Sequence, residues 1–478
     1  MNSLSFKIFS FLSLLIFNSL FSIDVNVMHY GAKGNGIIDD TFAFQECADL
    51  LASKGGGNLV IPQGNYLIRK INFIGKKYSN INLIGNNANI IEKIATNRRS
   101  LGRFQTYAQK SAADGIFVFE ANVSYQKNDT ESIKNISISG LNFISDVEKY
   151  GFDELSHQIS AHGVSNFKIK NCNFKGFLGD GIAINRGTHE TGARNAYNKN
   201  IIIENCVFDG VNNNNRNGIS IYYSDGFIIT DCDFENITRP DMIGAIDIEA
   251  DDTFNISRNG IIRNCNFKNI GGLAAIAFFQ KSANNYKNLL IENCVIDGAT
   301  TPLYVLGNDN FQNNPFEEDI IMRNCNVKNT AVAAIIIKGY NIFFENVKFE
   351  NITSSVANVV PEGGASNITF SNCTFKNTIN PAGIGFTGVL KNINFIGNTF
   401  EDFVAQAITI NSPTGIGKIK NNYFKSTKQQ QSLPLITHYF GSLSEISESE
   451  VSGNISYQNY LPLDLRFFTK ETNLKDGF

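Results

Sequence analysis

Two carboxylates within one short segment of this chain could carry out acid–base chemistry. Asp247 and Glu249 alternate with isoleucines in the segment 245–249. This alternation predicts a strand whose isoleucines face a core and whose carboxylates face outward, into solvent. The Cα atoms of residues two apart on a strand lie about 7 Å apart. Glycoside hydrolysis needs such a pair, because one carboxyl protonates the leaving oxygen while the other activates water or attacks carbon. We therefore take Asp247 and Glu249 as candidate catalytic residues.

A third carboxylate, Asp180, precedes the similar apolar segment 181–184 and is also a candidate catalytic residue. Two alternatives remain open for the acidic residues. Asp180 could only cap a turn before Gly181. Asp247 and Glu249 could be solvated edge residues, or ligands of a calcium ion.

Aromatic and basic residues near these carboxylates could bind a sugar polymer. Alignment of the similar segments predicts Tyr222 and Phe279 one repeat to either side of Glu249, and rings of this kind stack on apolar sugar faces. Arginine binds carboxylates with two parallel hydrogen bonds, which would suit a uronic-acid polymer. Ordinary surface charge is the alternative for each arginine. The candidate substrate-binding residues are Arg186, His189, Glu190, Arg216, Tyr222, Phe279 and His162.

A six-residue pattern, "apolar-x-Asn-Cys-x-Phe", recurs along the chain and indicates the elements that position these residues. Successive copies begin 22 to 34 residues apart. Each unit also carries a second alternating apolar segment, so the repeat predicts a solenoid with parallel strands stacked about 4.8 Å apart. The Cys slot of the pattern is occupied by Leu141, Cys172, Cys206, Cys232, Cys265, Cys294, Cys325, Val347, Cys373, Asn398 and Asn422.

The Asn before this slot suits a sharp corner, because Asn tolerates the left-handed backbone conformation better than most residues. We expect these asparagines to stack as a ladder of side-chain amides from coil to coil. Seven of the eight cysteines occupy the slot. We expect buried, reduced cysteines stacked inside the coils. Disulfides between stacked neighbours remain the alternative in an exported protein.

The first 22 residues predict export. Lys7 precedes an apolar run from Ile8 to Phe21, and Ser22 is a small residue at a plausible cleavage point. An uncleaved anchor or a buried strand is the alternative. We expect a secreted, periplasmic or cell-surface protein without a membrane span in the mature chain. The formal net charge of −3 gives no reason to expect nucleic acid as a partner.

Residues 27–68 resemble the opening of the pectate-lyase-like superfamily, close to the rhamnogalacturonase/epimerase-like members. The matching residues are Tyr30 to Gly36, Asp39 to Gln45 and Gly55 to Tyr66, with Asn35 where the usual pattern has Asp. The resemblance implies an all-β fold, a right-handed parallel β-helix. We expect one such domain over residues 23–478, with an N-terminal cap at about 23–58. A short helix from Thr41 to Ser53 would close its end, which gives Asp39 and Asp40 structural roles.

Subfamily signatures of this superfamily fit less well. The polygalacturonase motifs are matched only at His162-Gly163. The alginate epimerase motif is matched only from Tyr150 to Asp153. We expect the longest loops, 187–200, 251–259 and 308–318, to make walls beside the candidate groove.

Three functions remain open, all with a polysaccharide as partner. A glycoside hydrolase is favoured. A polysaccharide lyase or epimerase would use Tyr222, His162 or His189 to remove the proton beside a uronate carboxylate. A non-catalytic glycan-binding or adhesive β-helix is the third. No cofactor or metal is expected, except a calcium ion if the protein is a lyase.

Overall fold

The computed structural model describes residues 23–93, 114–121, 128–185, 197–250, 256–279, 286–307, 320–353, 365–378, 382–387, 390–403, 406–411, 416–427, 436–438, 450–458, 461–462, 466–468 and 475–476. The predicted export signal lies outside these residues. So do the candidate residues Arg186, His189 and Glu190, and most of the three long loops.

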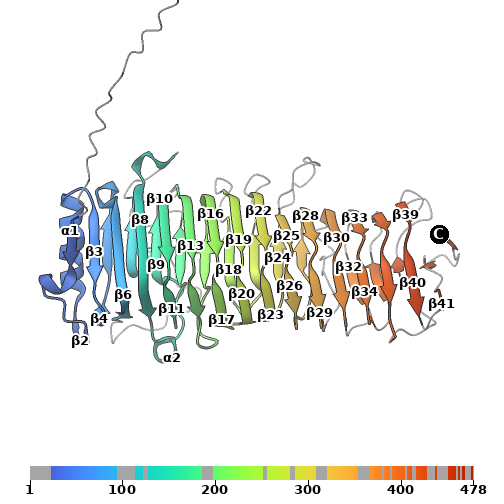
Figure 1. Ribbon diagram of the computed structural model, residues 1–478, viewed down its shortest axis with the longest axis horizontal. Helices are drawn as coiled ribbons and strands as arrows, with labels where there is room; N and C mark the ends of the chain where they lie inside the picture. Colours follow the sequence, from blue (N-terminus) through green and yellow to red (C-terminus); the bar gives the residue numbers. More distant parts are fainter. Residues whose placement is uncertain are drawn as a thin grey trace, which may run out of the picture.

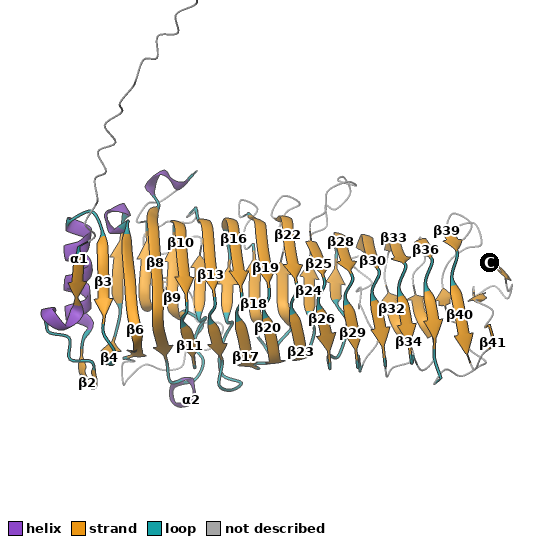
Figure 2. Ribbon diagram, viewed as in Figure 1, coloured by secondary structure: helices purple, strands orange, loops and turns teal. Residues whose placement is uncertain are grey.

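The chain winds into a right-handed parallel β-helix, as predicted. Its coils follow one another along the long axis of the molecule, from α1 at one end to the marked C-terminus at the other (Figure 1). A full coil carries three strands, which build three faces that we number in chain order. Strands dominate the described structure, and helices are confined to a few short segments (Figure 2).

The first face is formed by the strand that opens each coil. Its strands are β1 (Asp24–Asn26), β3 (Gly57–Ile61), β6 (Ile81–Glu92), β8 (Ile133–Ile144), β10 (Val164–Lys170), β13 (Lys199–Glu204), β16 (Ser224–Thr230), β19 (Ser257–Arg263), β22 (Tyr286–Glu292), β25 (Ile320–Arg323), β28 (Gly339–Glu345), β30 (Ala365–Ser371), β33 (Leu390–Ile396), β36 (Ile416–Lys420) and β39 (Glu450–Ser452). β6 and β8 are long enough to continue onto the second face.

The second face follows after a corner. Its other strands are β2 (Asn35–Asp39), β4 (Asn65–Ile68), β11 (Asn173–Lys175), β14 (Val207–Asp209), β17 (Asp233–Ile237), β20 (Asn266–Ile270), β23 (Val295–Ala299), β26 (Asn326–Lys328), β29 (Lys348–Glu350), β31 (Thr374–Lys376), β34 (Thr399–Glu401), β37 (Tyr423–Lys425) and β40 (Ile455–Gln458). β41 (Leu461–Pro462) pairs with β40 in the antiparallel sense.

The third face carries the candidate residues. It consists of two sheets, and the first contains β5 (Ile71–Ile74), β7 (Asp114–Glu120), β9 (Ser156–His162), β12 (Ile182–Asn185), β15 (Ile219–Ile221), β18 (Gly244–Glu249), β21 (Ala274–Phe279), β24 (Leu303–Leu306) and β27 (Ile335–Ile337). The second contains β32 (Ala382–Thr387), β35 (Gln406–Asn411), β38 (Ile436–His438), β42 (Arg466–Phe468) and β43 (Lys475–Asp476). All described pairs within the third face are parallel except β42 with β43.

The predicted asparagine ladder is present at the corner between the first and second faces. Asn171 and Asn205 have φ values of 52° and 50°, in the left-handed region. The side-chain amide of Asn205 donates to Asn171 Oδ1 at 2.8 Å. Asn264 donates to Asp231 Oδ1 at 3.1 Å, so the Asp at this slot supplies the same acceptor.

The interior is apolar and stacked in register. Phe174, Phe208, Phe234 and Phe267 form one column, with neighbouring ring centroids 4.8 to 4.9 Å apart. All eight cysteines are buried and none forms a disulfide, as expected for the seven in the repeated slot. This continuous packing fixes the rotation of each coil, and with it the direction of every side chain on the third face.

A capping helix covers the N-terminal end of the solenoid. Helix α1 (Thr41–Ser53) has the predicted bounds and buries Phe44, Cys47 and Leu51 against the first coils. Asp40 is buried, and its carboxylate accepts hydrogen bonds from the backbone of Lys33 at 2.6 Å and Gly34 at 3.1 Å. Its role is therefore structural, as expected.

The remaining helical segments are short. They are the helix α2 (Val147–Tyr150) and 3-10 turns at Val27–Tyr30, Lys76–Tyr78 and Asp129–Glu131. Within the described ranges, none of the helices has the length and apolar character needed to cross a membrane.

Candidate functional site

The third face brings most of the described candidate residues onto neighbouring coils. Ser160, Ala183, Ser220, Asp247 and Ala277 occupy one column, because each pairs in register with the next. They alternate with buried isoleucines, so their side chains point away from the core. Alignment of the repeats predicts this order and continues it through Tyr304 to Ile336; the structure confirms it as far as Tyr304, but Tyr304 pairs with Ile335, so the prediction is wrong for Ile336.

Asp247 and Glu249 lie on β18, and their exposure differs. Glu249 is half-buried, whereas Asp247 is fully buried. The expectation that both face solvent was therefore wrong for Asp247. The side-chain amide of Asn217 on the preceding coil donates to Asp247 Oδ2 at 3.1 Å and packs against it. Strand alternation sets the direction of a side chain, but neighbouring coils decide whether water reaches it.

Asp180 is held in a buried ion pair with Arg216. Nη1 of Arg216 lies 2.5 Å from Oδ1 and 2.6 Å from Oδ2 of Asp180, and the backbone N–H of Asn217 donates to Oδ1 at 3.2 Å. Burial by itself would raise the pKa of the Asp180 carboxyl. The charge of Arg216 and the contact with His157, whose Nδ1 lies 3.2 Å from Asp180 Oδ2, together more than offset this, so the pKa of Asp180 lies below its ordinary value. Asp180 is thus an ionised partner of arginine, which makes it a poor proton donor.

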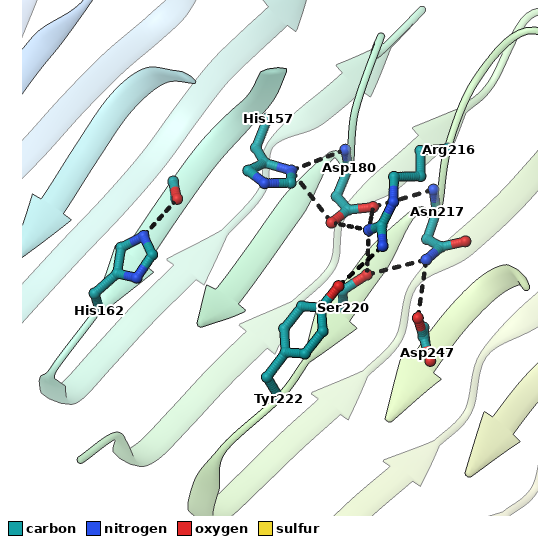
Figure 3. A network of polar contacts seen from close by, with 9 residues as sticks. His157, His162, Asp180, Arg216, Asn217, Ser220, Tyr222 and Asp247 are labelled. Carbon is teal, nitrogen blue, oxygen red and sulfur yellow. Dashed lines mark hydrogen bonds and ion pairs between the residues drawn. The ribbon is translucent and has the colours of Figure 1, made fainter. Parts of the chain in front are cut away.

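Arg216 connects this ion pair to Tyr222. Its Nη2 donates to Tyr222 Oη at 2.9 Å, and its Nη1 donates to Ser220 Oγ at 3.3 Å (Figure 3). Burial raises the pKa of Tyr222 well above its ordinary value, and the nearby carboxylate of Glu249 raises it further against the opposing effect of Arg216. The phenol therefore stays protonated at neutral pH. The guanidinium of Arg216 is held in place by Asp180, and its hydrogen bond to Tyr222 therefore orients the phenol in this structure.

Two further residues belong to the network although neither was a predicted site residue. Asn217 Nδ2 also donates to Ser220 Oγ at 3.1 Å, and Asn217 Oδ1 accepts from the backbone of Gly244 at 3.3 Å. His157 lies on β9, and its Nδ1 accepts the backbone N–H of Asp180 at 3.1 Å. The only sequence signal for Asn217 is its position shortly before β15, whereas the contact between His157 and Asp180, 23 residues apart, depends on the stacking of coils.

The other candidates flank this network. His162 is fully buried two coils toward the N-terminus from Tyr222, and its Nε2 lies 2.9 Å from Ser160 Oγ. Phe279 pairs in register with Glu249 and is half-buried. Its ring centroid lies 5.5 Å from that of Tyr304 on the next coil. Phe279 and Tyr304 therefore form an aromatic surface on the C-terminal side of Glu249.

The chemistry available here is that of a carboxyl, a phenol and an aromatic surface. Glu249 and Tyr222 are half-buried groups that can exchange protons, and they lie on adjacent coils of the third face. Beneath them, Asp247, Asn217 and the Asp180–Arg216 pair form a rigid polar layer. Across the described part of the chain, no group of three or more His, Cys, Asp or Glu side chains is arranged to hold a metal ion.

Known proteins resemble this chain in fold and, over a short stretch, in sequence. Plasmin and fibronectin-binding protein A of Streptococcus pneumoniae is 42% identical over 60 residues, which is 12% of this chain. The chain spans only 8% of the length of that curated relative. The solved N-terminal fragment of bacteriophage phi29 gene product 12 is 17% identical, with 92% of this chain and 74% of that chain covered and a TM-score of 0.65.

A second solved structure, the surface protein and adhesin PfbA of Streptococcus pneumoniae, is 16% identical, with 94% of this chain and all of that chain covered and a TM-score of 0.50. At such identities both structures support the fold alone. The family model described as rhamnogalacturonase A/epimerase, pectate lyase-like, matches residues 24–300, which is more than half of the chain. The chain therefore belongs to the rhamnogalacturonase A/epimerase, pectate lyase-like family.

Proposed function

We propose that this protein is an exported glycoside hydrolase that cleaves a polysaccharide on the third face of the β-helix. One observation carries the proposal. Glu249 is half-exposed, stands two residues from the buried carboxylate of Asp247, and lies between the aromatic side chains of Tyr222 and Phe279. Sugar-binding sites combine such aromatic surface with a few placed polar groups.

In this proposal Glu249 is the carboxyl that meets the glycosidic oxygen and protonates it as the bond breaks. Asp247 supplies the second carboxylate, which stabilises the positive charge that develops on the sugar ring. Asn217 holds Asp247 through one hydrogen bond, so this carboxylate is oriented before substrate arrives. Because Asp247 is buried, attack on carbon would require the side chains above it to move when the substrate binds.

The test is cleavage of a panel of neutral and acidic polysaccharides by the full mature chain. A hydrolase releases reducing ends without ultraviolet absorbance. The substitutions Glu249→Gln and Asp247→Asn should each reduce the rate by orders of magnitude, because the acid and the second carboxylate are lost. Glu350→Gln, on the second face, is the matched control and should leave the rate unchanged. Near-wild-type cleavage by both site variants would defeat the assignment.

A uronate lyase or epimerase is the second candidate, and the contact between Arg216 and Tyr222 favours it. A guanidinium beside a phenol favours its ionised form, so Tyr222 could exchange a proton with the substrate. The raised pKa of Tyr222 predicts that such a reaction would run fastest at alkaline pH. In the same screen, products absorbing ultraviolet light, lost in Tyr222→Phe, would identify a lyase. Binding without cleavage of any polysaccharide would favour the third alternative, a glycan-binding or adhesive protein.

A further inference from the structure

A second asparagine ladder runs along the first face and is interrupted at one coil. Asn166, Asn200, Asn259 and Asn288 share one backbone position, with φ between 53° and 56°, and Gly226 takes this position between Asn200 and Asn259. Asn200 donates its side-chain amide to Asn166 Oδ1 at 3.0 Å, and Asn288 donates to Asn259 Oδ1 at 3.1 Å. Among the described coils from Asn166 to Asn288, the coil of Gly226 lacks the side chain that would continue this series.

The missing side chain changes the contacts of both neighbours. Asn259 donates instead to the carboxylate of Asp225, at 3.2 Å. An ideal Cβ at Gly226 would lie 3.3 Å from Asn200 Oδ1, so that oxygen faces the vacated position. The amide oxygen of Asn200 is therefore an acceptor directed toward a position at which the next coil has no side-chain donor.

A hollow of about 590 Å³ lies at this interruption. Its floor includes Ile202, Ile228 and Ile261, which pair in register on β13, β16 and β19 and point outward, half-buried. Its rim includes the amide side chains of Asn200 and Asn259. The volume falls within the range of about 300–1,000 Å³ that is usual for sites that bind small molecules.

The chemistry of this hollow fits a neutral sugar. A pyranose ring presents an apolar face of C–H groups and an edge of hydroxyl groups, which match an aliphatic floor and an amide rim. A hydroxyl could donate to Asn200 Oδ1 and accept from Asn259. The nearest cation, Lys168, forms an ion pair with Glu204, so it offers no net charge for an acidic ligand.

We propose that the hollow at Gly226 is a second carbohydrate site, which binds a neutral pyranose segment of a glycan. It lies on the first face, whereas Glu249 and Asp247 lie on the third, so it is independent of the proposed cleavage site. Its function is to hold a glycan chain without reacting with it. Gly226 is the residue that opens the site, because any side chain there would enter the hollow.

The experiment follows the methyl signals of isoleucine by nuclear magnetic resonance in the intact protein. The probes are cellohexaose, xylohexaose and mannohexaose, with hexagalacturonate as the acidic comparison. At least one neutral probe should shift the signals of Ile202, Ile228 and Ile261. Ile321 lies on the same outward column two coils beyond Ile261 and should not respond. A response to hexagalacturonate alone would overturn the neutral assignment.

The variant Gly226→Asn tests the site directly. Asn tolerates the left-handed conformation, so the variant should fold, continue the ladder, fill the hollow and weaken probe binding at least tenfold. Asn200→Ala should also weaken binding, whereas the matched change Asn288→Ala, outside the hollow, should not. Unchanged affinity in Gly226→Asn and Asn200→Ala would overturn the proposal. So would concentration-dependent shifts of Ile321 without probe, because these would mean that a second copy of the chain covers this column.

Discussion

Removing the charge of Asp180 should destabilise the protein strongly, although the residue lies at the proposed site. In Asp180→Asn the side chain keeps its shape, but the guanidinium of Arg216 loses its negative partner, because an amide nitrogen replaces one of the two oxygens at 2.5 and 2.6 Å from Nη1. The side chains are 0% and 9% exposed, so water cannot replace the lost partner. Breaking one member of a buried ion pair typically costs about 3–5 kcal/mol. We expect a loss of this size in the free energy of unfolding.

The assay is denaturation by urea, with the midpoint and slope compared between variants. Glu292→Gln is the matched control, because Glu292 pairs at 2.8 Å with an Arg323 side chain that is 42% exposed. An exposed pair of this kind contributes about 0–1 kcal/mol. In the double variant Asp180→Asn/Arg216→Met the loss should be smaller than the sum of the two single losses, because no charge is left buried.

The pH dependence provides a second check with a definite sign. The pKa of Asp180 is lower in the folded state than in the unfolded state, whose value is about 3.9. The ion pair therefore stabilises the protein fully above that value, and its contribution is lost as the pH falls through the folded pKa. The difference in the free energy of unfolding between the wild type and Asp180→Asn should become smaller below about pH 4. A loss under about 1 kcal/mol at neutral pH would refute the reasoning.

Two further predictions concern ionisable groups away from the site. Burial raises the pKa of Cys172 to about 12, so the stacked cysteines should resist a thiol reagent in the native protein and react once it is denatured; intramolecular disulfides in the mass spectrum would contradict this. Hydrogen bonds from Arg258 lower the pKa of Asp225 to about 2. In urea denaturation, Arg258→Ala should therefore have a lower free energy of unfolding than the wild type above about pH 4, and this difference should disappear toward about pH 2. A difference that does not change with pH would contradict the second prediction.

Much of the fold could be predicted from local sequence patterns, because each coil repeats the same arrangement of strands and corners. The Asn and Cys slots mark corners that need a left-handed residue and a small buried side chain, and the structure has Asn205 and Cys206 in these roles. The bounds of the capping helix, Thr41–Ser53, were equally local, since Asp40 and Gly55 bracket an amphipathic run. The sequence pattern did not indicate the second asparagine ladder, which includes Asn200, because its asparagines are not followed by the Cys that marks the first ladder.

The candidate site was only partly predictable. Alternation within each strand determined that Asp247, Glu249 and Phe279 point outward, since this depends on neighbours in the sequence. The partners of a side chain depend on the coils above and below it, 27 to 37 residues away in the chain. The burial of Asp247 by Asn217, and the capture of Asp180 by Arg216, were therefore decided by the stacking of coils. The tertiary structure alone determines which of these outward polar groups remain half-exposed, because packing between coils controls access to water.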